Sequence, residues 1–566
     1  MILGIDLGTS NSLAAAYIDG EVVLVKNKAG SSVFPSIISM DSEGNIYTGD
    51  VALHRKKQYN DASVSMFKRS IGSGDKFLLG DKSYNAKDLS GILLKAIKKQ
   101  AEDFFGEEIT EAVISVPAFF NNYQRVAVIE AGKIAGFDVK RIVNEPTAAA
   151  LAYGVQNMED EAEQKVIIVL DLGGGTFDIS VMEVGENVME VVAVCGDNKL
   201  GGGDFTRRLI KLFKEHNNIL CELSEIEENL IWSEAQKAKH QITTEGYGKM
   251  SCIISDVLYE YEITEEEYTN ECFDLLEKIR KLSLQAVEES AYEPSDISDI
   301  IMVGGGTKLS IVRKMLEKMI GKNIDYNINY NINYNINPDE AVVRGVATYG
   351  ALINNDEKLA KIVLTDICSH YIGVTSYFSD EYDTATAFDI IVKKNTTIPV
   401  KKMVKHYSWP ARWIFSVIQC ENEYGIDSVT LDEFTYITPE LNSPNRIEVQ
   451  KSIIIDSDGI IYAEAYIPTN NMRYSKVVQY DDVEYTPEET NKKIEELKAM
   501  NLKFYGNEED VLLMARADRL YSESVGRDRE RINECIMTYE EALNRGKKAV
   551  IEQRKAELIE CLNYYE

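Results

Sequence analysis

The sequence predicts a protein of several domains, with an α/β region first, a β-sandwich next and a helical region last. Residues 1–355 alternate short apolar segments with helical patterns, which is typical of an α/β fold. Residues 368–484 form short apolar runs separated by turn residues such as "DSDG" and "ENEYG", as in a β-sandwich. The rest of the chain has helical spacing and many charges. A chain of 566 residues is also too long for a single core.

Within the α/β region, three apolar segments are predicted to be buried strands. They are 111–117 ("EAVISVP"), 165–172 ("KVIIVLDL") and 299–305 ("DIIMVGG"). The segment 122–137 ("NYQRVAVIEAGKIAGF") predicts a helix that ends near a glycine. Between residues 326 and 337 "YNIN" occurs three times, which indicates a low-complexity strand or surface segment rather than a functional repeat.

A linker is predicted at residues 356–367 ("DEKLAKIVLTDI"), because a charged stretch leads there into an apolar one that can dock or pair. The β-sandwich is expected from 368 to 484 and the helical region from 485 to 566. The helical region has a clear start signal: Thr486 can be an N-cap, Pro487 suits the first helical position, and Glu489 completes a capping box.

Composition restricts the kinds of partner that this protein can have. Lysine and arginine total 61 against 92 acidic residues, a formal net charge of −31, so nucleic acid and anionic membranes are poor partners. The eight cysteines and five histidines are scattered singly, which disfavours a zinc site or a disulfide framework and suits a reducing compartment. The first residues already predict a strand, so no export signal is expected, and no apolar stretch is long enough to span a bilayer.

Two glycine-rich turns carry an aspartate each. "LDLGGGTFDIS" (170–180) and "GIDLGTSNS" (4–12) share the layout strand, aspartate, any residue, glycine, and an apolar strand follows each. Each therefore predicts a hairpin with an aspartate at its tip. Glycines allow backbone N–H groups to approach phosphates, and a cation such as hydrated Mg²⁺ would offset the charge of the aspartates.

A third glycine cluster, "VGGGTKLS" (303–310), follows a predicted strand and precedes a helix, which suits a nucleoside at a helix N-terminus. The sequence contains no Walker loop, because G-x-x-x-x-G-K-[ST] does not occur. One cluster alone is weak support for a nucleotide site, but three clusters, two of them with strand-borne aspartates, predict nucleotide binding.

These three segments resemble the phosphate-1, phosphate-2 and adenosine motifs of the superfamily of actin, sugar kinases and heat-shock ATPases, which has an actin-like, ribonuclease-H-like α/β fold. Further segments resemble the seventy-kilodalton heat-shock, or DnaK-type, chaperones: "SVPAFFNNYQR", "RIVNEPTAAALAYG", "NKLGGGDF", "NPDEAV" and "KNTTIPV". The resemblance covers nearly the whole chain and is denser before residue 355. Length and a shortened C-terminal region are most similar to the HscC-type branch.

The resemblance implies an ATPase domain at 1–355, a substrate-binding sandwich and a helical lid, with ATP or ADP, Mg²⁺ and K⁺ as cofactors. It implies phosphate contacts by Gly8, Thr9, Ser10, Asn11, Gly173, Gly174, Gly175, Thr176, Gly202 and Gly203. Asp6 and Asp171 would hold Mg²⁺, and Asp178 would assist the K⁺ site. Lys68 would lie near the γ-phosphate and the attacking water, which Glu145 would orient, and Asp171 and Thr176 would complete the catalytic set.

The adenosine side departs from the family pattern. Where the family has Glu-x-x-Lys-Arg, this chain has "QKAKHQIT": Lys239 is retained, Gln236 replaces the acid and His240 replaces the arginine. The substitutions predict a nucleotide that binds more weakly or exchanges faster. The rest of this pocket is expected to consist of Gly305, Gly306, Lys308 and Asp339.

The resemblance also implies that nucleotide controls peptide binding by the sandwich. Pro117, Arg125, Arg141 and Asp366 match the interdomain switch, and Asn144 matches a residue that contacts the linker. Thr365 interrupts the apolar linker run, so coupling is expected to be looser. Aligning "HYSWPARWIFSVIQ" on the family puts Tyr407 at an arch position and Trp413 at the central pocket, which predicts narrow client specificity. Trp413 as an ordinary core residue is an equally open alternative.

The interpretation is therefore an ATP-dependent chaperone of the bacterial cytoplasm that binds extended apolar peptide segments. A J-domain cochaperone and a nucleotide exchange factor are the expected partners, and neither nucleic acid nor membrane is. Two alternatives stay open. One is a chaperone-like protein that binds ATP with little hydrolysis, which the changes at Gln236 and His240 allow. The other is an actin-like assembly protein, which would leave the sandwich and the helical region unexplained.

Overall fold

A computed structural model describes most of the chain. The described residues are 1–56, 62–155, 165–185, 188–255, 257–320, 337–354, 356, 359, 362–378, 389–409, 412–424, 428–438, 446–478, 502–503 and 548–565, with single residues and short stretches between 513 and 542. The predicted capping box at Thr486 and the "YNIN" copies up to residue 336 lie outside them.

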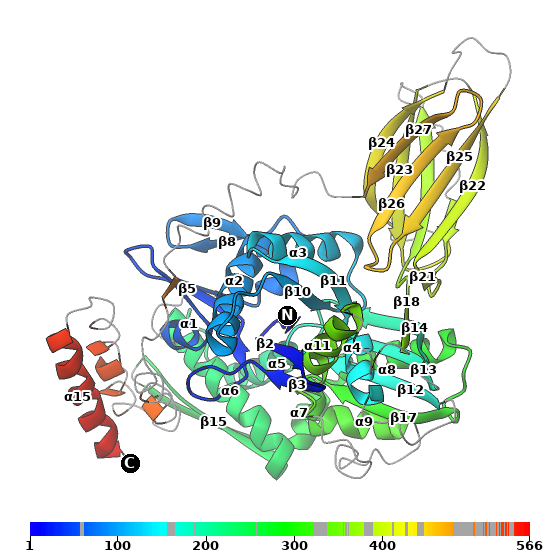
Figure 1. The fold of residues 1–566 in the computed structure, drawn as a ribbon. Coiled ribbons are helices and arrows are strands. Elements are labelled where there is room, and N and C mark those ends of the chain that lie inside the picture. The colour runs from blue at the N-terminus through cyan, green and yellow to red at the C-terminus, as the bar shows by residue number, and fades with distance from the viewer. Residues whose placement is uncertain are drawn as a thin grey trace.

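The N-terminal region, residues 1–354, which we call the α/β body, contains two mixed sheets built on the same plan (Figure 1). In each sheet a central strand is parallel to one neighbour and antiparallel to the strand that follows it in the chain. The first sheet has the order β11-β10-β1-β2-β3, and β4 pairs with β2. Its strands are β1 (Ile2–Asp6), β2 (Asn11–Ile18), β3 (Glu21–Leu24), β4 (Phe34–Pro35), β10 (Glu111–Val116) and β11 (Asp138–Asn144).

The second sheet of the body has the order β17-β12-β13-β14, with β12 (Lys165–Leu172), β13 (Phe177–Gly185), β14 (Val188–Asp197) and β17 (Ile297–Val303). The three predicted strands of the body are therefore confirmed, although the third lies two residues earlier than expected. In both sheets the central strand and its antiparallel partner form a hairpin with an aspartate near its tip, as predicted from the glycine-rich segments.

Helices cover the sheets because each has an apolar face. α2 (Ala86–Phe105) and α3 (Asn122–Ile134) pack on the first sheet, and α5 (Gly202–His216), α6 (Glu225–Glu245), α8 (Phe273–Glu289) and α9 (Ser310–Ile320) pack on the second. The helix predicted to reach residue 137 ends at Ile134, because Gly136 adopts a left-handed conformation (φ 86°) and the Phe137 N–H bonds back to the carbonyl of Gly132.

α4 (Glu145–Val155) and α11 (Ala341–Ile353) lie between the two sheets, packed against strands of both. Their approach is close at one glycine: a Cβ on Gly345 would lie 1.7 Å from the carbonyl oxygen of Ala148. Smaller elements complete the body: α1 (Gly49–Lys56), β5 (Ile37–Met40), β6 (Ile46–Thr48), β7 (Ser63–Ser65), β8 (Lys76–Leu79), β9 (Lys82–Asn85), α7 (Glu265–Glu271), β15 (Tyr247–Ile254), β16 (Val257–Thr264) and the one-turn helices Phe67–Ser70 and Gly305–Lys308.

Residues 368–478, which we call the sandwich, form two four-stranded sheets that share one core. The sheets have the orders β20-β19-β23-β24 and β22-β25-β26-β27. Their strands are β19 (Tyr371–Phe378), β20 (Asp389–Val392), β22 (Val400–Ser408), β23 (Arg412–Cys420), β24 (Val429–Ile437), β25 (Ile447–Ile455), β26 (Ile461–Ile467) and β27 (Met472–Val477). In β26 every second residue is buried, which is the alternation expected of a strand with one face on a core.

One strand joins the body to the sandwich. β18 (Val363–Ile367) pairs in parallel with β14 and in antiparallel with β21 (Thr397–Ile398), which precedes β22. The second sheet of the body therefore continues through β18 to the base of the sandwich (Figure 1). The apolar half of the expected linker is thus a paired strand.

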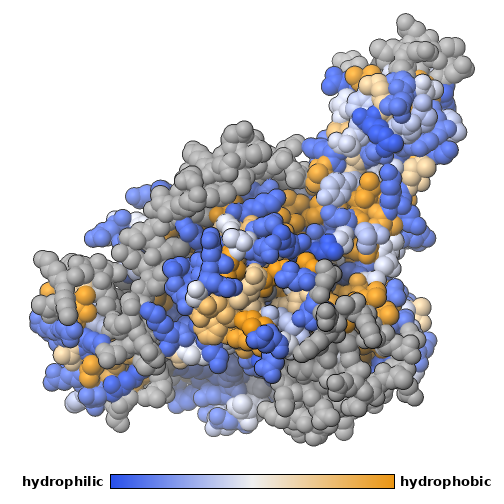
Figure 2. All heavy atoms as spheres, in the orientation of Figure 1, coloured by the Kyte–Doolittle hydropathy of each residue, from blue (hydrophilic) through white to orange (hydrophobic). Residues whose placement is uncertain are grey.

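The C-terminal helix α15 (Lys548–Tyr565) packs with buried residues such as Leu513, Ile532 and Tyr539 in a small separate cluster. Figure 1 shows α15 on the other side of the α/β body from the sandwich. The short strand β28 (Leu502–Lys503), which precedes it, pairs in parallel with β6 of the body. Among the described residues, no helix is long and apolar enough to cross a membrane. The visible face of the sandwich is mainly hydrophilic (Figure 2).

Substitution of Gly345 by alanine should destabilise the body by about 3 kcal/mol, because its Cβ would enter the space of the Ala148 carbonyl between α4 and α11. Urea denaturation measures the change. Gly74→Ala is the matched control, since a Cβ there would meet nothing within 4 Å. Equal stability of the two variants would contradict the close packing of α4 and α11.

Candidate active site

The two hairpin turns of the α/β body touch each other. A Cβ on Gly174 would lie 2.2 Å from the Ser10 hydroxyl oxygen, and one on Gly175 would lie 2.8 Å from a methyl carbon of Thr9. A Cβ on Gly8 would lie 1.9 Å from the carbonyl oxygen of Asn11. The absence of a side chain at Gly174 and Gly175 lets the two turns approach this closely, so the structure brings together the residues predicted to contact phosphates at 8–11 and 173–176.

Two further glycine segments close on the same turns. The N–H groups of Gly202 and Gly203 donate to the carbonyls of Gly173 and Gly174, both at 2.9 Å. On the other side, a Cβ on Gly306 would lie 2.6 Å from the carbonyl oxygen of Leu172, whereas one on Gly305 would meet nothing within 4 Å. All three glycine clusters singled out in the sequence therefore border one site, and Gly305 faces open space.

A buried ion pair lies beside the turns. The Lys68 ammonium is 2.8 Å from Oε1 of Glu145, and both residues are buried. Lys68 comes from the one-turn helix after Met66, whose backbone is left-handed (φ 58°), and Glu145 begins α4 directly after β11. The pair joins two predicted catalytic residues from segments 77 positions apart.

Three aspartates surround this pair. Asp171 and Asp178 are buried and face each other across the β12–β13 ladder, and Asp6 is partly buried at the end of β1. The Ser115 hydroxyl donates to Oδ1 of Asp6 at 2.9 Å, and the Phe119 N–H donates to Oδ1 of Asp178 at 2.9 Å. Asp6 and Asp178 are thus each oriented by a hydrogen bond from a neighbouring segment.

The aspartates carry more negative charge than the site compensates. Burial, followed by the charge of Glu145, raises the pKa of Asp6 and of Asp178 to about 7. Burial and the same glutamate also raise the pKa of Asp171 well above its ordinary value. Lys68 lowers these pKa values but does not cancel the effect, so the site fits an additional cation.

Mg²⁺ that keeps most of its waters and binds phosphate suits this geometry. Among the described residues, no three His, Cys, Asp or Glu side chains are close enough together to ligate a metal directly.

Arg69 is a site residue that sequence reasoning missed. Its guanidinium donates to the carbonyl of Gly175 at 3.0 Å and pairs with Asp204 at 2.5 Å. Asp204 in turn accepts from the N–H of Gly201 at 2.8 Å. Arg69 therefore ties the phosphate-2 turn to the turn before α5. The only signal for it was its place next to Lys68.

The residues of the predicted adenosine side come from two places in the fold: α6, which carries Gln236, Lys239 and His240, and the segments that carry Lys308 and Asp339. The Thr206 hydroxyl lies 3.3 Å from Oε1 of Gln236 and 2.9 Å from the Lys239 ammonium, which also donates to the carbonyl of Gly202. Burial lowers the pKa of Lys239 to about 8. His240, in contrast, is exposed on α6.

Across the site from α6, Lys308 and Asp339 form an ion pair at 2.5 Å. This ion pair connects the end of the third glycine cluster to the turn that precedes α11. The pair thereby accounts for the last two residues predicted on the adenosine side.

The predicted switch residues gather where β18 meets the body. The carboxylate of Asp366 accepts from the Asn144 amide at 2.5 Å and from the Thr147 hydroxyl at 3.3 Å. Arg125 donates to the same Asn144 amide oxygen at 2.8 Å and to the Asp458 carbonyl of the sandwich at 3.3 Å. Burial raises the pKa of Asp366.

Arg141 also reaches the sandwich, where its guanidinium contacts the Ser457 hydroxyl and lies 3.7 Å from the carboxylate of Asp458. Ser457 and Asp458 belong to the turn between β25 and β26, a contact that sequence reasoning missed. Pro117 is buried in the turn that leads from β10 into α3, and its carbonyl accepts from the Phe120 N–H. Arg125, Arg141 and Asp366 thus lie along one junction, and Pro117 lies in the turn that precedes α3.

The two residues predicted to contact peptide have different surroundings. Tyr407 is 60% exposed on β22, and its hydroxyl lies 3.4 Å from Glu448. Trp413 is 4% exposed, belongs to the sandwich core, and its indole N–H donates to the carbonyl of Trp409 at 3.1 Å. Of the two alternatives stated for Trp413, its burial favours core packing.

Magnesium with ATP should release protons when it binds at pH 6, because burial raises the pKa of Asp6 to about 7 and also raises that of Asp171, and both carboxyl groups must ionise to hold the cation. We expect roughly one to two protons at pH 6 and almost none at pH 8.5. Titration calorimetry in buffers of different ionisation enthalpy counts them. Without ligand, the raised pKa values favour folding below the ordinary value of 3.8, and this contribution is lost as pH rises through about 7.

Asp6→Asn removes one of these carboxyl groups, and it should release about one proton fewer at pH 6. Proton release that is the same at both pH values would contradict the charge balance inferred for the site.

The sequence matches one protein family over almost its whole length. A profile of the family described as "Hsp70 protein" matches residues 2–78 and 74–563. The proteins named Chaperone protein DnaK from Thermosipho melanesiensis and Thermosipho africanus are each 33% identical over 543 residues, which cover 92% of this chain and 87% and 86% of the relatives. The one from Thermotoga petrophila is 33% identical over 576 residues, covering 96% of this chain and 93% of the relative.

The matches extend from the first glycine turn to the C-terminal helix, so they include both the site and the sandwich. The resemblance to DnaK-type proteins stated from the sequence is confirmed, while its assignment to the HscC-type branch stays a prediction. The profile match and the three relatives together establish that this chain belongs to the Hsp70 family of ATP-dependent chaperones.

Proposed function

We propose that this chain hydrolyses ATP between its glycine turns and that the nucleotide controls the grip of the sandwich on extended apolar peptide segments. The observation that carries the proposal is the buried Lys68–Glu145 ion pair, which lies among three aspartates. A single hydrogen bond connects the residue before Glu145 to Asp366 of the linker strand β18. Glu145 begins α4, one residue after Asn144, whose amide bonds to Asp366 of the linker strand. A change at the phosphates therefore has two neighbouring residues through which to reach the linker.

In this proposal the N–H groups of the turns at 8–11 and 173–176 bind the phosphates, because no side chain obstructs them. Lys68 places its ammonium by the transferred phosphoryl group and the attacking water, and Glu145 orients that water. Asp6 and Asp171 hold hydrated Mg²⁺, which supplies charge neutralisation when bound, and Asp178 assists a K⁺ site. Thr176 completes the catalytic set.

Gln236, Lys239 and Gly306 line the adenosine side in this proposal, and Lys308 and Asp339 brace it. His240 is exposed and so contributes less than an arginine that stacks on the base. The proposed consequence is weak or rapidly exchanging nucleotide.

For the rest of the chain, we propose the ATPase domain at 1–355, the linker at 356–367, the peptide-binding sandwich at 368–484 and a helical lid at 485–566. Tyr407 would line the peptide arch. Trp413 is packed in the sandwich core, so in this proposal it would influence the choice of client only by supporting the strands that line the peptide site. A J-domain cochaperone, an exchange factor and the bacterial cytoplasm are the partners and location that this function calls for.

Substitution of Lys68 by alanine should slow single-turnover ATP hydrolysis by about 100-fold or more, since one preorganised charge at the reacting phosphate is lost. Binding of ATP should persist. Lys99→Ala, which removes an exposed lysine paired with Asp103, is the control and should hydrolyse normally. Hydrolysis by Lys68→Ala at the wild-type rate would remove Lys68 from the mechanism.

Substitution of Gln236 by glutamate should slow ADP release by about fivefold, because a carboxylate there would pair with Lys239 and accept more strongly from a ribose hydroxyl. Stopped-flow displacement of a fluorescent ADP measures the rate. An unchanged rate would contradict the role given to Gln236.

The decisive test is the release of a labelled unfolded polypeptide, such as reduced and carboxymethylated α-lactalbumin, from the full chain. Release should be at least tenfold faster with ATP than with ADP if the coupling free energy has the usual size. Equal release in the two states would refute the proposed function. Single-turnover hydrolysis with and without a J-domain protein then separates an active ATPase from a protein that mainly binds ATP.

Substitution of Asp366 by asparagine should remove most of this nucleotide dependence, because the Asn144 amide and the Thr147 hydroxyl lose their charged acceptor. Asp296→Asn, an exposed aspartate remote from β18, should retain it. Full nucleotide dependence in Asp366→Asn would show that coupling does not run through this carboxylate.

A further inference from the structure

The first turn of α3 inserts two neighbouring side chains into the sandwich. Asn122 is 2% exposed and Tyr123 is 9% exposed, and Tyr123 belongs to the hydrophobic core of the sandwich although the chain places it in the body. The helix start is rigid, because Asn121 and Gln124 form a capping box around these two residues. The pair is distinct from Arg125 and Arg141, which were expected at this junction.

Tyr123 reaches an irregularity in the sheet that contains β23 and β24. In their ladder Val417 pairs with Asp432 and Ile418 pairs with Thr430, so Leu431 is an extra residue in a β-bulge of the edge strand β24. The Tyr123 hydroxyl donates to the carbonyl of Leu431 and lies 3.1 Å from that of Thr430. Leu431 is itself 2% exposed, so its carbonyl is shielded from water and the Tyr123 hydroxyl supplies it with a hydrogen bond.

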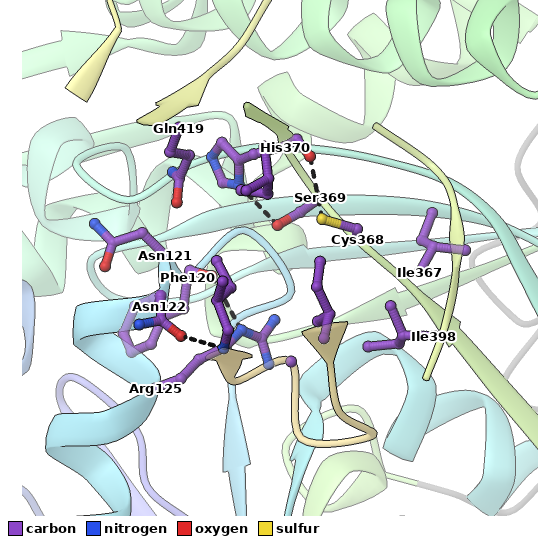
Figure 3. Close-up of a pocket in the computed structure, with 14 residues that line it drawn as sticks. Phe120, Asn121, Asn122, Arg125, Ile367, Cys368, Ser369, His370, Ile398 and Gln419 are labelled. Carbon is purple, nitrogen blue, oxygen red and sulfur yellow. Dashed lines mark hydrogen bonds between the residues drawn. The ribbon is translucent and has the colours of Figure 1, made fainter. Parts of the chain in front are cut away.

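Asn122 extends the other sheet. Its amide oxygen accepts from the Ile461 N–H at 2.9 Å, and its amide NH₂ donates to the Val478 carbonyl at 2.5 Å. Val478 already donates its own N–H to the Ile461 carbonyl, so the side-chain amide adds one peptide-like rung to the end of the β26–β27 ladder. Figure 3 shows Asn122 at the edge of the cavity between body and sandwich, with a dashed line for its bond to the Ile461 N–H.

The contact between α3 and the sandwich leaves little empty space and involves both sheets of the sandwich. The cavity between α3 and the sandwich measures about 20 Å³, which is room for roughly one water molecule. On the sandwich side, the polar contacts of Arg125 and Arg141 go to Ser457 and Asp458, in the turn that connects two strands of one sheet. Tyr123 bonds to the opposite sheet, so among these contacts it is the one that holds both sheets against α3.

We propose that Asn122 and Tyr123 form a docking latch, in which α3 completes the base of the sandwich by capping the bulge at Leu431 and extending the β26–β27 ladder. The latch stabilises the docked arrangement of body and sandwich. Both are positioning residues: they touch neither nucleotide nor peptide and act by setting the fraction of docked molecules. The inference rests on the proposed function, in which ATP speeds peptide release, and adds that ATP does so by favouring the docked arrangement.

Hydrogen exchange of the full chain tests the latch directly, because the Ile461 amide is bonded to Asn122. Mass spectrometry should show that segments covering 429–432 and 461–467 exchange more slowly with ATP than with ADP. In Tyr123→Phe, which keeps the ring and removes the hydroxyl, ATP-dependent protection should fall by about fivefold to tenfold in both segments, as expected for one buried hydrogen bond. Asn122→Ala should expose the 461–467 segment most.

Tyr268→Phe is the matched control. Tyr268 is also buried and donates to a backbone carbonyl, that of Phe205, but inside the body. The Tyr268→Phe control should lose stability without losing ATP-dependent protection of the sandwich.

Peptide release is a second measurement. In Tyr123→Phe, release with ATP should slow by about fivefold to tenfold, the same factor as the loss of protection, and release with ADP should stay unchanged. Melting temperature and ATP binding verify that each variant is folded.

Two failures are distinguishable. If the wild-type chain exchanges and releases peptide identically with ATP and ADP, the proposed function fails and the latch fails with it. If the wild-type chain responds to nucleotide and Tyr123→Phe and Asn122→Ala respond equally well, the proposed function stands and the latch is refuted.

Discussion

The arrangement of this chain depends on a local excess of negative charge. Asp6, Asp171, Asp178 and Glu145 converge where two sheets meet, and Lys68 is the cation that faces them. Carboxylates removed from water in this way raise one another's pKa, which is unfavourable for an empty site and favourable for one that takes a cation with phosphates. The contacts that hold the aspartates, from the Ser115 hydroxyl and the Phe119 N–H, are therefore supports for a ligand as much as for the fold.

The same convergence explains how a distant domain can respond. The two hairpins belong to sheets of the same plan, and glycine lets their turns touch without side chains between them. The second sheet then continues through β14 and β18 to β21 at the base of the sandwich. One continuous sheet therefore runs from the glycine turn at 173–176 to the base of the sandwich, and the polar contacts of Asp366 and Arg125 lie beside its last strands.

Much of the site could be predicted because its chemistry is local in the sequence. The turns at 8–11 and 173–176 need glycine whatever surrounds them, and an aspartate at the end of a buried strand has few structural uses. The exposure of His240 and the clamp formed by Arg69 could not be predicted, because both depend on how α5 and α6 face the turns. The same holds for the burial of Trp413, which follows from how the two sheets of the sandwich pack.

The sequence by itself determined the order of the domains, the nucleotide chemistry and the family, since these follow from periodicity and from short motifs whose residues are neighbours in the chain. Only the tertiary structure decided that Lys68 pairs with Glu145, that β18 is a paired strand, and that Tyr123 lies in the core of another domain. The physical reason is that these contacts join segments tens to hundreds of residues apart. Their energies depend on packing and desolvation, which arise only when the segments meet.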